Sequence, residues 1–126
     1  MARVDNYEQR FGGIGRLYGT DALTRLRQAH ICVIGIGGVG SWAVEALARS
    51  GVGKITMIDM DDICVTNINR QIHALTGNIG QLKTEVMQQR VKLINPECDI
   101  NVVDDFISAE NLSQYLRAEY DYVIDA

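Results

Sequence analysis

The stretch HICVIGIGGVG, residues 30–40, decides the fold of this chain. Residues 30–34 form a near-continuous apolar run rich in β-branched side chains, which is typical of a strand buried in a parallel sheet. Four glycines follow the run: Gly35, Gly37, Gly38 and Gly40. A strand, a glycine-rich turn and a helix in this order predict the first half of a β-α-β unit.

Outward from this turn, helical and strand patterns alternate along the chain. The helix after the turn has a predicted apolar face made of Val39, Ala43, Ala46 and Leu47. A second helical stripe, which stops at Asn95 and Pro96, is made of Ile79, Leu82, Val86 and Leu93. Further buried strands are predicted at residues 54–59, 99–106 and 122–126. Ser108 is a predicted N-cap for a short helix between the last two strands.

The alternation predicts an α/β fold, a Rossmann-like parallel sheet flanked by helices. Residues 30–126 are expected to form the N-terminal part of this domain, and residues 1–29 an N-terminal helical arm with one helix at 21–28. Residues 122–126 have the composition of the middle of a buried strand. We therefore expect the sheet to be truncated after the fourth strand and the chain to be an N-terminal fragment of a longer protein.

Composition narrows the class of protein. A hydrophobic content of 47% with a single proline favours a packed globular domain over a disordered chain. The net charge of −4 does not support an electrostatic grip on nucleic acid within these residues. No apolar run approaches the roughly 20 residues that a membrane-spanning helix needs.

The cysteines and histidines show no metal-binding pattern. Cys32, Cys64 and Cys98 are an odd set without CxxC spacing, which favours a reduced, cytoplasmic protein. Cys32 is expected in the core, and His73 on a helix surface. No metal ligand is assigned from the sequence.

The glycine turn has the chemistry of an anion site. Its glycines let the backbone approach a phosphate, and the following helix presents free N–H groups and a positive dipole end. Asp59 closes the second predicted strand, where its carboxylate can accept a hydrogen bond from a ribose hydroxyl. A nicotinamide- or flavin-dependent dehydrogenase satisfies the same pattern and stays an alternative at this point.

Two cations after the second strand favour a triphosphate. Arg70 follows in the loop, and Lys83 stands at the start of the next helix. A dehydrogenase has no need of both, and Asp59 disfavours a 2′-phosphate as the partner of Arg70. Arg70 and Lys83 are predicted catalytic residues that bracket the β- and γ-phosphates and stabilise a pyrophosphate leaving group. In the alternative interpretation, Arg70 pairs with the acidic loop and Lys83 is a solvated helix residue.

An ordered set of motifs resembles the adenylation domain of the E1-like, ubiquitin-activating-type superfamily. The set consists of Gly35-x-Gly37-Gly38-x-Gly40, Asp59 with Asp61, Asn67-x-Asn69-Arg70-Gln71, Lys83 and Ile94-Asn95-Pro96. Within the superfamily, the bacterial tRNA threonylcarbamoyladenosine dehydratases are most similar, on Arg10-Phe11-Gly12-Gly13, Leu17-Tyr18-Gly19, Gly40-Ser41-Trp42 and residues 70–75.

The resemblance implies ATP-dependent adenylation of the threonylcarbamoyl carboxylate on a tRNA adenosine, followed by dehydrative cyclisation, with Mg²⁺ assisting. The implied nucleotide contacts are Gly35, Gly37, Gly38, Gly40, Asp59, Asp61, Asn67, Asn69, Arg70 and Lys83. Relatives also extend an N-terminal arginine to the ATP of the other subunit. Gly13 replaces its usual second arginine here, so Arg16 is the substitute catalytic candidate. The resemblance also implies a Mg²⁺-positioning aspartate a few residues beyond Asp125, in an Asp-x-x-Asp pattern of which Asp125 matches the first member only.

The resemblance also implies a homodimer and, as partner, a tRNA that bears threonylcarbamoyladenosine. An alternative within the superfamily is adenylation of the C-terminus of a ubiquitin-like sulfur-carrier protein, with a sulfur-carrier or cysteine-desulfurase system as partner. An alternative of another class is an NAD-dependent oxidoreductase or a non-catalytic nucleotide-binding module. The isolated fragment is expected to be inactive.

Overall fold

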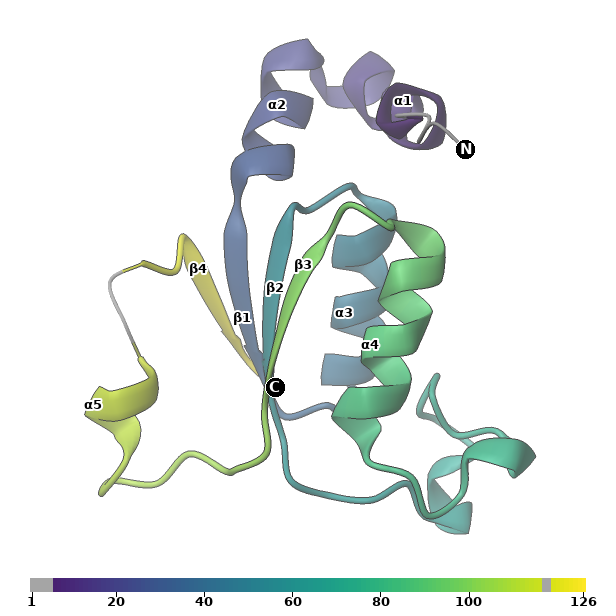
Figure 1. Cartoon of the computed structure of the whole chain (residues 1–126), viewed down its shortest axis with the longest axis vertical. Coiled ribbons are helices and arrows are strands. Elements are labelled where there is room, and N and C mark those ends of the chain that lie inside the picture. The colour runs from purple at the N-terminus through teal and green to yellow at the C-terminus, as the bar shows by residue number, and fades with distance from the viewer. Residues whose placement is uncertain (1–5, 117–118) are drawn as a thin grey trace, which may run out of the picture.

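The computed structural model describes residues 6–116 and 119–126. Its elements in chain order are α1 (Tyr7–Tyr18), α2 (Thr20–Gln28), β1 (His30–Ile34), α3 (Gly40–Arg49), β2 (Lys54–Ile58), η1 (Val65–Asn67), η2 (Thr76–Asn78), α4 (Lys83–Ile94), β3 (Asp99–Val103), α5 (Leu112–Tyr115) and β4 (Tyr122–Asp125). Helices α1 and α2 lie beyond one end of the sheet, and α5 lies on the other side of it from α3 and α4 (Figure 1). None of these helices is long and apolar enough to span a bilayer.

The four strands form one parallel sheet in the order β3-β2-β1-β4. Strand β1 pairs with β2 from His30 opposite Lys54 to Ile34 opposite Ile58, and with β4 on its other side. The chain thus builds outward through β2 and β3 and then returns to the far side of β1. The strand order therefore reverses at β1, which confirms the predicted Rossmann-like α/β fold.

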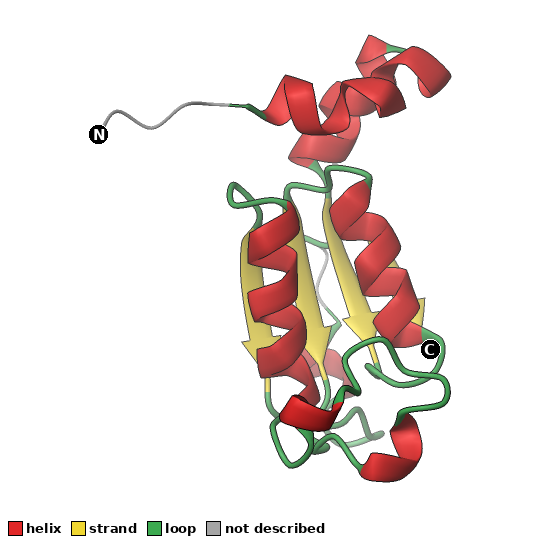
Figure 2. Ribbon diagram, turned by 90° about the vertical axis from the view of Figure 1, so that its right-hand side faces the viewer, coloured by secondary structure: helices red, strands yellow, loops and turns green. Residues whose placement is uncertain are grey.

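Helices α3 and α4 cover one face of the sheet (Figure 2), and the main core lies between the two layers. Its fully buried members include Val33, Val44, Ile55, Met57, Met87 and Val91. Each large aliphatic side chain removed from water contributes about 1.5–3 kcal/mol, so this layer contact dominates the stability. Glu45 of α3 also bonds Arg90 of α4 at 2.6 Å, which joins the two helices at the edge of the core.

The buried face of α3 differs from the predicted one. Val44 and Ala48 are fully buried, whereas Val39 is 70% exposed. The cause lies at Gly40, where an added Cβ would stand 1.6 Å from the carbonyl oxygen of Gly35. This backbone approach sets the rotation of the helix, because only a residue without a side chain fits there.

Helix α4 also buries a different stripe. It begins at Lys83, so Ile79 and Leu82 of the predicted stripe lie in the preceding turn, and Leu93 is exposed. The buried residues of α4 are Lys83, Thr84, Val86, Met87 and Val91. An apolar period alone could not locate the start of the helix, because that start is set by pairing of the flanking loops, as in the bridge between Asp62 and Leu82.

The segment after β3 leaves the sheet earlier than predicted. Strand β3 ends at Val103, and Ser108 does not cap α5, which begins at Leu112. In this segment, hydrogen bonds with side chains take the place of the expected strand pairing and helix cap. Asn111 Oδ1, for example, accepts the N–H of Ser108 at 2.8 Å. Short polar side chains that bond the nearby backbone compete with regular structure in this way.

Two helices precede β1, where the sequence predicts one. Helix α1 contains Gly12, Gly13 and Gly15, each of which disfavours a helix by about 1 kcal/mol relative to alanine. Packing offsets this cost, because Tyr7 and Phe11 of α1 form a small buried cluster with a leucine of α2. Tertiary contacts rather than local propensity therefore form this helix.

Candidate functional site

The glycine turn joins the carboxyl end of β1 to α3. Gly35 has φ +86°, a left-handed conformation that favours glycine. Its N–H donates to the carbonyl of Ile58 at 2.9 Å, and the fully buried side chain of Ile36 anchors the turn in the core. The turn is thereby held at the edge of the sheet where β1 and β2 end.

Four successive N–H groups of this turn, those of residues 37–40, find no acceptor within the described parts of the chain. No side chain caps the ten-residue helix α3 that follows. Unpaired amides at the positive end of a helix dipole attract an anion, and phosphate oxygens are suitable acceptors. The turn is therefore a preorganised anion site.

Asp59 connects the end of β2 to the turn. Its Oδ2 accepts the N–H of Ile36 at 2.7 Å, and its Oδ1 accepts the N–H of Asp61 at 2.7 Å. A carboxylate has about four lone-pair sites, so it can still accept hydrogen bonds from hydroxyl groups. Its position next to the turn suits the ribose contact that the sequence predicts.

Arg70 lies beside the turn. Its side-chain carbons stand 3.7–3.8 Å from where a Cβ on Gly38 would be. Its Nη1 donates to the carbonyl of Thr66 at 3.1 Å and to Asn69 Oδ1 at 2.9 Å. No carboxylate of the described residues forms an ion pair with it, so its charge stays available, contrary to the alternative in which it pairs with the acidic loop.

Lys83 is 8% exposed at the first position of α4. Within the described ranges, its ammonium group has no hydrogen-bond acceptor or carboxylate partner. The positive charge of Lys83 also acts on His73. Burial is the main cause that lowers the pKa of His73, and the charge of Lys83 lowers it further. The side chain of Lys83 is thus mostly packed rather than fully solvated as in the alternative interpretation, and its ammonium group can still take an anion as partner.

The remaining predicted contacts belong to the loop between β2 and α4. Asn67 is buried, and its Oδ1 accepts the N–H of Cys64 at 2.8 Å, which shapes the loop. Asn69 is exposed and orients Arg70. The carbonyl of Asp61 accepts the N–H of Lys83 at 3.1 Å, so this loop places the start of α4 near the end of β2.

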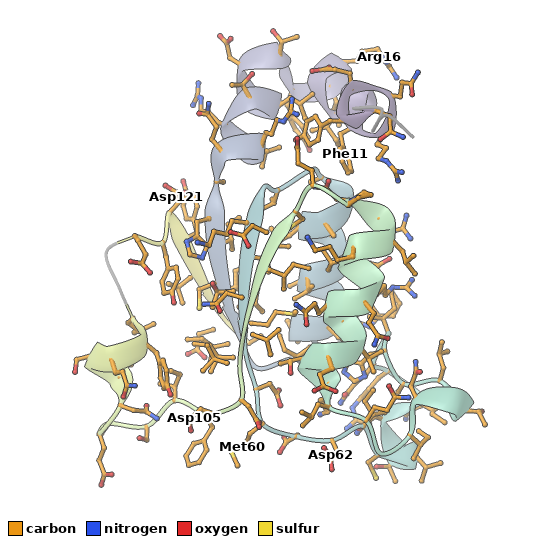
Figure 3. The ribbon with its side chains drawn as sticks, viewed as in Figure 1. Phe11, Arg16, Met60, Asp62, Asp105 and Asp121 are labelled. Atoms are coloured by element: carbon orange, nitrogen blue, oxygen red, sulfur yellow. The ribbon has the colours of Figure 1, made fainter. Side chains whose placement is uncertain are left out.

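A depression of about 560 Å³ opens at the carboxyl ends of all four strands. Gly35, Asp59, Phe106 and Asp125 line it, one from the end of each strand or the loop after it. Met60 and Asp105, which also line it, lie at the same end of the molecule (Figure 3). Open α/β sheets bind ligands outside this edge, at the point where the strand order reverses.

The sequence of residues 13–126 matches the ThiF family, which is nine-tenths of the chain. This chain belongs to the ThiF family. It is 78% identical over 126 residues to the tRNA threonylcarbamoyladenosine dehydratase of Haemophilus influenzae, covering 100% of this chain and 48% of that protein. A more distant relative is the sulfur carrier protein adenylyltransferase of Thermus thermophilus, 33% identical over 108 residues, with 86% of this chain and 40% of the relative covered.

A solved structure has the same fold. The Escherichia coli tRNA N6-threonylcarbamoyladenosine dehydratase in complex with ATP has a TM-score of 0.95 and 61% identity, with 100% of this chain and 52% of that chain covered. The chain thus spans about half the length of the relatives that it matches. These comparisons confirm the superfamily that the motifs indicate.

Within this ThiF-family chain, Arg16 stands apart from the other predicted site residues. It lies on α1, at the opposite end of the sheet from Asp62 and Met60 (Figure 3). The structure therefore places Asp59 and Arg70 beside the glycine turn and Lys83 next to Asp61, whereas Arg16 lies at the other end of the molecule.

Two buried residues of the site are missing from the sequence-based assignment. His73 is 1% exposed, not on a helix surface, and its Nε2 lies 2.8 Å from the carbonyl oxygen of Ile36. Gln71 is also buried, and its Oε1 has no partner within the described residues. The pairing of His73 with Ile36 spans 37 positions, so no local pattern could have revealed it.

Proposed function

We propose that this chain is the ATP-binding part of an enzyme that adenylates the threonylcarbamoyl carboxylate on a tRNA adenosine and then cyclises the product. The observation that carries the proposal is the set of unpaired N–H groups at residues 37–40, next to the side chain of Arg70. Lys83, at the start of α4, adds a second cation without a carboxylate partner among the described residues. A triphosphate supplies the negative charge that this arrangement lacks. The ATP complex of the E. coli relative supports the choice of nucleotide.

In the proposed reaction, a carboxylate oxygen attacks the α-phosphorus of ATP. A new O–P bond forms, the bond from that phosphorus to the bridging oxygen breaks, and pyrophosphate leaves with the electron pair. Arg70 and Lys83 stabilise the charge that develops on the leaving group. A nucleophilic atom of the threonylcarbamoyl ureido group then attacks the activated acyl carbon and closes the ring. The bond from that carbon to the AMP oxygen breaks, AMP leaves with the electron pair, and the attacking group loses a proton.

The other predicted contacts take binding roles in this proposal. Asp59 accepts hydrogen bonds from the ribose hydroxyls, while Asn67 and Asn69 hold the loop that presents Arg70 to the phosphate tail. Asp61 places Lys83 through its carbonyl. Gly35 and Gly40 allow the close backbone approach that forms the turn.

Mg²⁺ belongs to the proposal as an ion that neutralises phosphate charge. No group of three ligating side chains is placed to hold a metal within residues 6–116 and 119–126. Proteins often bind Mg²⁺ through one or two carboxylates together with substrate phosphates. Asp125, at the end of β4 in the depression, matches the first aspartate of the Asp-x-x-Asp pattern, and the later aspartate of that pattern is the one that positions Mg²⁺.

The cellular setting is also part of the proposal. We infer a cytoplasmic homodimer in which Arg16 of each copy reaches the ATP of the other. The acidic charge of the chain assigns most of the tRNA contact to other parts of the protein. Adenylation of a sulfur-carrier protein, with a sulfur-carrier or cysteine-desulfurase partner, has the weaker support, because the relative that carries that name is 33% rather than 78% identical.

Pyrophosphate exchange tests the proposal in the full-length protein that contains this chain. Labelled pyrophosphate should enter ATP when tRNA bearing threonylcarbamoyladenosine is added, and unmodified tRNA is the matched control. If pyrophosphate exchange responds only to a sulfur-carrier protein, the tRNA substrate would be refuted and the alternative substrate supported. Equilibrium binding of NAD without binding of ATP would overturn both and indicate an oxidoreductase.

A further inference from the structure

Ile36 is fixed at both of its backbone polar groups. Its N–H donates to Asp59 Oδ2 at 2.7 Å, and its carbonyl oxygen lies 2.8 Å from Nε2 of His73. Its side chain is fully buried. Ile36 directly precedes the four unpaired N–H groups, so these two hydrogen bonds set the orientation in which the anion site begins.

The partner of His73 determines the tautomer of its ring. A carbonyl oxygen only accepts, so Nε2 must carry the proton and donate it. In the neutral ring, Nδ1 then holds a lone pair, and this atom is buried without a hydrogen-bond donor among the described residues. Among the described residues the ring therefore forms one hydrogen bond, and its acceptor is the Ile36 carbonyl in the glycine turn.

The charged groups that act on His73 come from two elements. Burial lowers the pKa of His73, and Lys83 of α4 lowers it further. The hydrogen bond to Ile36 and the charge of Asp59, at the end of β2, act in the opposite direction. A second proton on the ring would place a charge without an acceptor beside Lys83, so the neutral form predominates at pH 7.

We propose that His73 is a positioning residue of the nucleotide site, which holds the Ile36 carbonyl inward and thereby turns the N–H of Gly37 outward toward the phosphates. The trans peptide plane is rigid, so the Ile36 carbonyl and the Gly37 N–H point in opposite directions. His73 touches no phosphate in this scheme and acts through one peptide group. The inference rests on the proposed ATP site.

Two variants in the full-length protein separate positioning from packing. His73→Leu removes the donor and leaves a buried carbonyl unpaired, so ATP should bind about tenfold more weakly, which corresponds to the loss of one hydrogen bond. His73→Gln keeps an amide donor at a similar reach, so its affinity should stay within about threefold of the original. His30→Leu is the control, because His30 bonds Thr56 at the other end of β1.

Equal loss of affinity in both His73 variants, or none in His73→Leu, would overturn the positioning role. If His73→Leu fails to fold, the ATP affinity of His73→Gln tests the proposal. A loss well beyond threefold in His73→Gln would show that the site needs the imidazole itself rather than a hydrogen-bond donor, and it would overturn the positioning role.

Nitrogen NMR of the imidazole provides a readout that does not depend on ATP. We expect His73 to be neutral at pH 7, with the proton on Nε2, before any nucleotide is added. A proton on Nδ1, or a charged ring at pH 7, would contradict the inference even if ATP binds. Conversely, if the expected tautomer is found but ATP does not bind, the proposed function would be refuted. The hydrogen bond from His73 to the glycine turn would then remain as a structural feature without the proposed role in nucleotide binding.

Discussion

At the residue scale, the site depends on side chains whose surroundings are unusual for their type. Lys83 is buried without a counter-charge, His73 is buried with one hydrogen bond, and Arg70 has no carboxylate partner among the described residues. Buried polar groups are normally paired, so such exceptions concentrate where a ligand completes them. All three lie beside the glycine turn or on the loop that packs behind it.

Replacing Lys83 should separate stability from binding. In Lys83→Met the cation is removed but the methylene chain is kept, so ATP affinity should fall about tenfold or more, because a charge-assisted contact is lost. The free energy of unfolding should change by less than about 1 kcal/mol, since the ammonium group has no hydrogen bond or ion pair with the described residues to lose. Calorimetric titration and urea unfolding measure the two effects.

Lys54→Met is the control for this variant, because Lys54 is only partly buried at the other end of the sheet and its one ion pair among the described residues is with exposed Asp99 at 3.7 Å. It should change neither quantity appreciably. A destabilised Lys83→Met protein with normal ATP affinity would show that Lys83 has a structural role only.

Cysteine reactivity should differ sharply between positions. Cys64 is exposed, and a hydrogen bond from Thr66 at 3.3 Å, aided by the charge of Lys83, lowers the pKa of its thiol. Burial raises the pKa of Cys32 and Cys98 to about 11. Because the thiolate is the nucleophile, iodoacetamide at pH 7 should label Cys64 in the folded protein and the other two only after unfolding.

Peptide mass mapping after labelling checks this prediction, with Cys64→Ser as the control that should remain unlabelled in this segment. Labelling of Cys32 or Cys98 at the same rate as Cys64 in the folded protein would contradict it.

At the element scale, close backbone approach decides how α3 sits on the sheet. The strand, turn and helix around residues 30–49 follow from local sequence, and the structure confirms all three. The rotation of α3 does not follow from its apolar period, because it is set by the contact of Gly40 with the carbonyl of Gly35. The same limit applies to α1, whose glycines hide a helix that packing stabilises.

Gly40→Ala should disrupt this contact. The added Cβ would overlap the carbonyl of Gly35, so we expect a loss of about 3 kcal/mol in the free energy of unfolding, as for overpacked sites. Gly77→Ala is the control: Gly77 lies in η2 with no atom within 4 Å of an added Cβ, and its change should stay within about 0.5 kcal/mol. If denaturant unfolding shows both variants near wild-type stability, the contact between Gly40 and the Gly35 carbonyl does not set the rotation of α3.

At the scale of the whole molecule, the strand order brings distant segments to one edge. Residues after β1, β2 and β3 and at the end of β4 line the same depression although they are spread from Gly35 to Asp125. In a parallel sheet all strands end on the same side, so a predicted topology also predicts where a site forms. This explains why most predicted contacts lie together and why Arg16, at the amino end, does not.

Residues 1–126 by themselves are expected to show no measurable adenylation. Strand β4 stands at the edge of the sheet with Tyr122 and Val123 exposed, and the H. influenzae relative is about twice as long as this chain. Pyrophosphate exchange by this segment and by the full-length protein, at equal concentration, measures the difference. Comparable exchange rates would show that these residues contain the whole catalytic site.

The sequence by itself determined the α/β fold class and the position of the glycine turn, because strand patterns, glycine spacing and the following helix are local signals. Only the tertiary structure decided that the side chain of Lys83 is mostly buried, with no ion pair to the described residues, and that His73 bonds the Ile36 carbonyl. Both depend on contacts between segments far apart in the chain, where burial and hydrogen-bond geometry are set by packing. The turn is encoded locally, and its orientation toward a ligand is set by the fold.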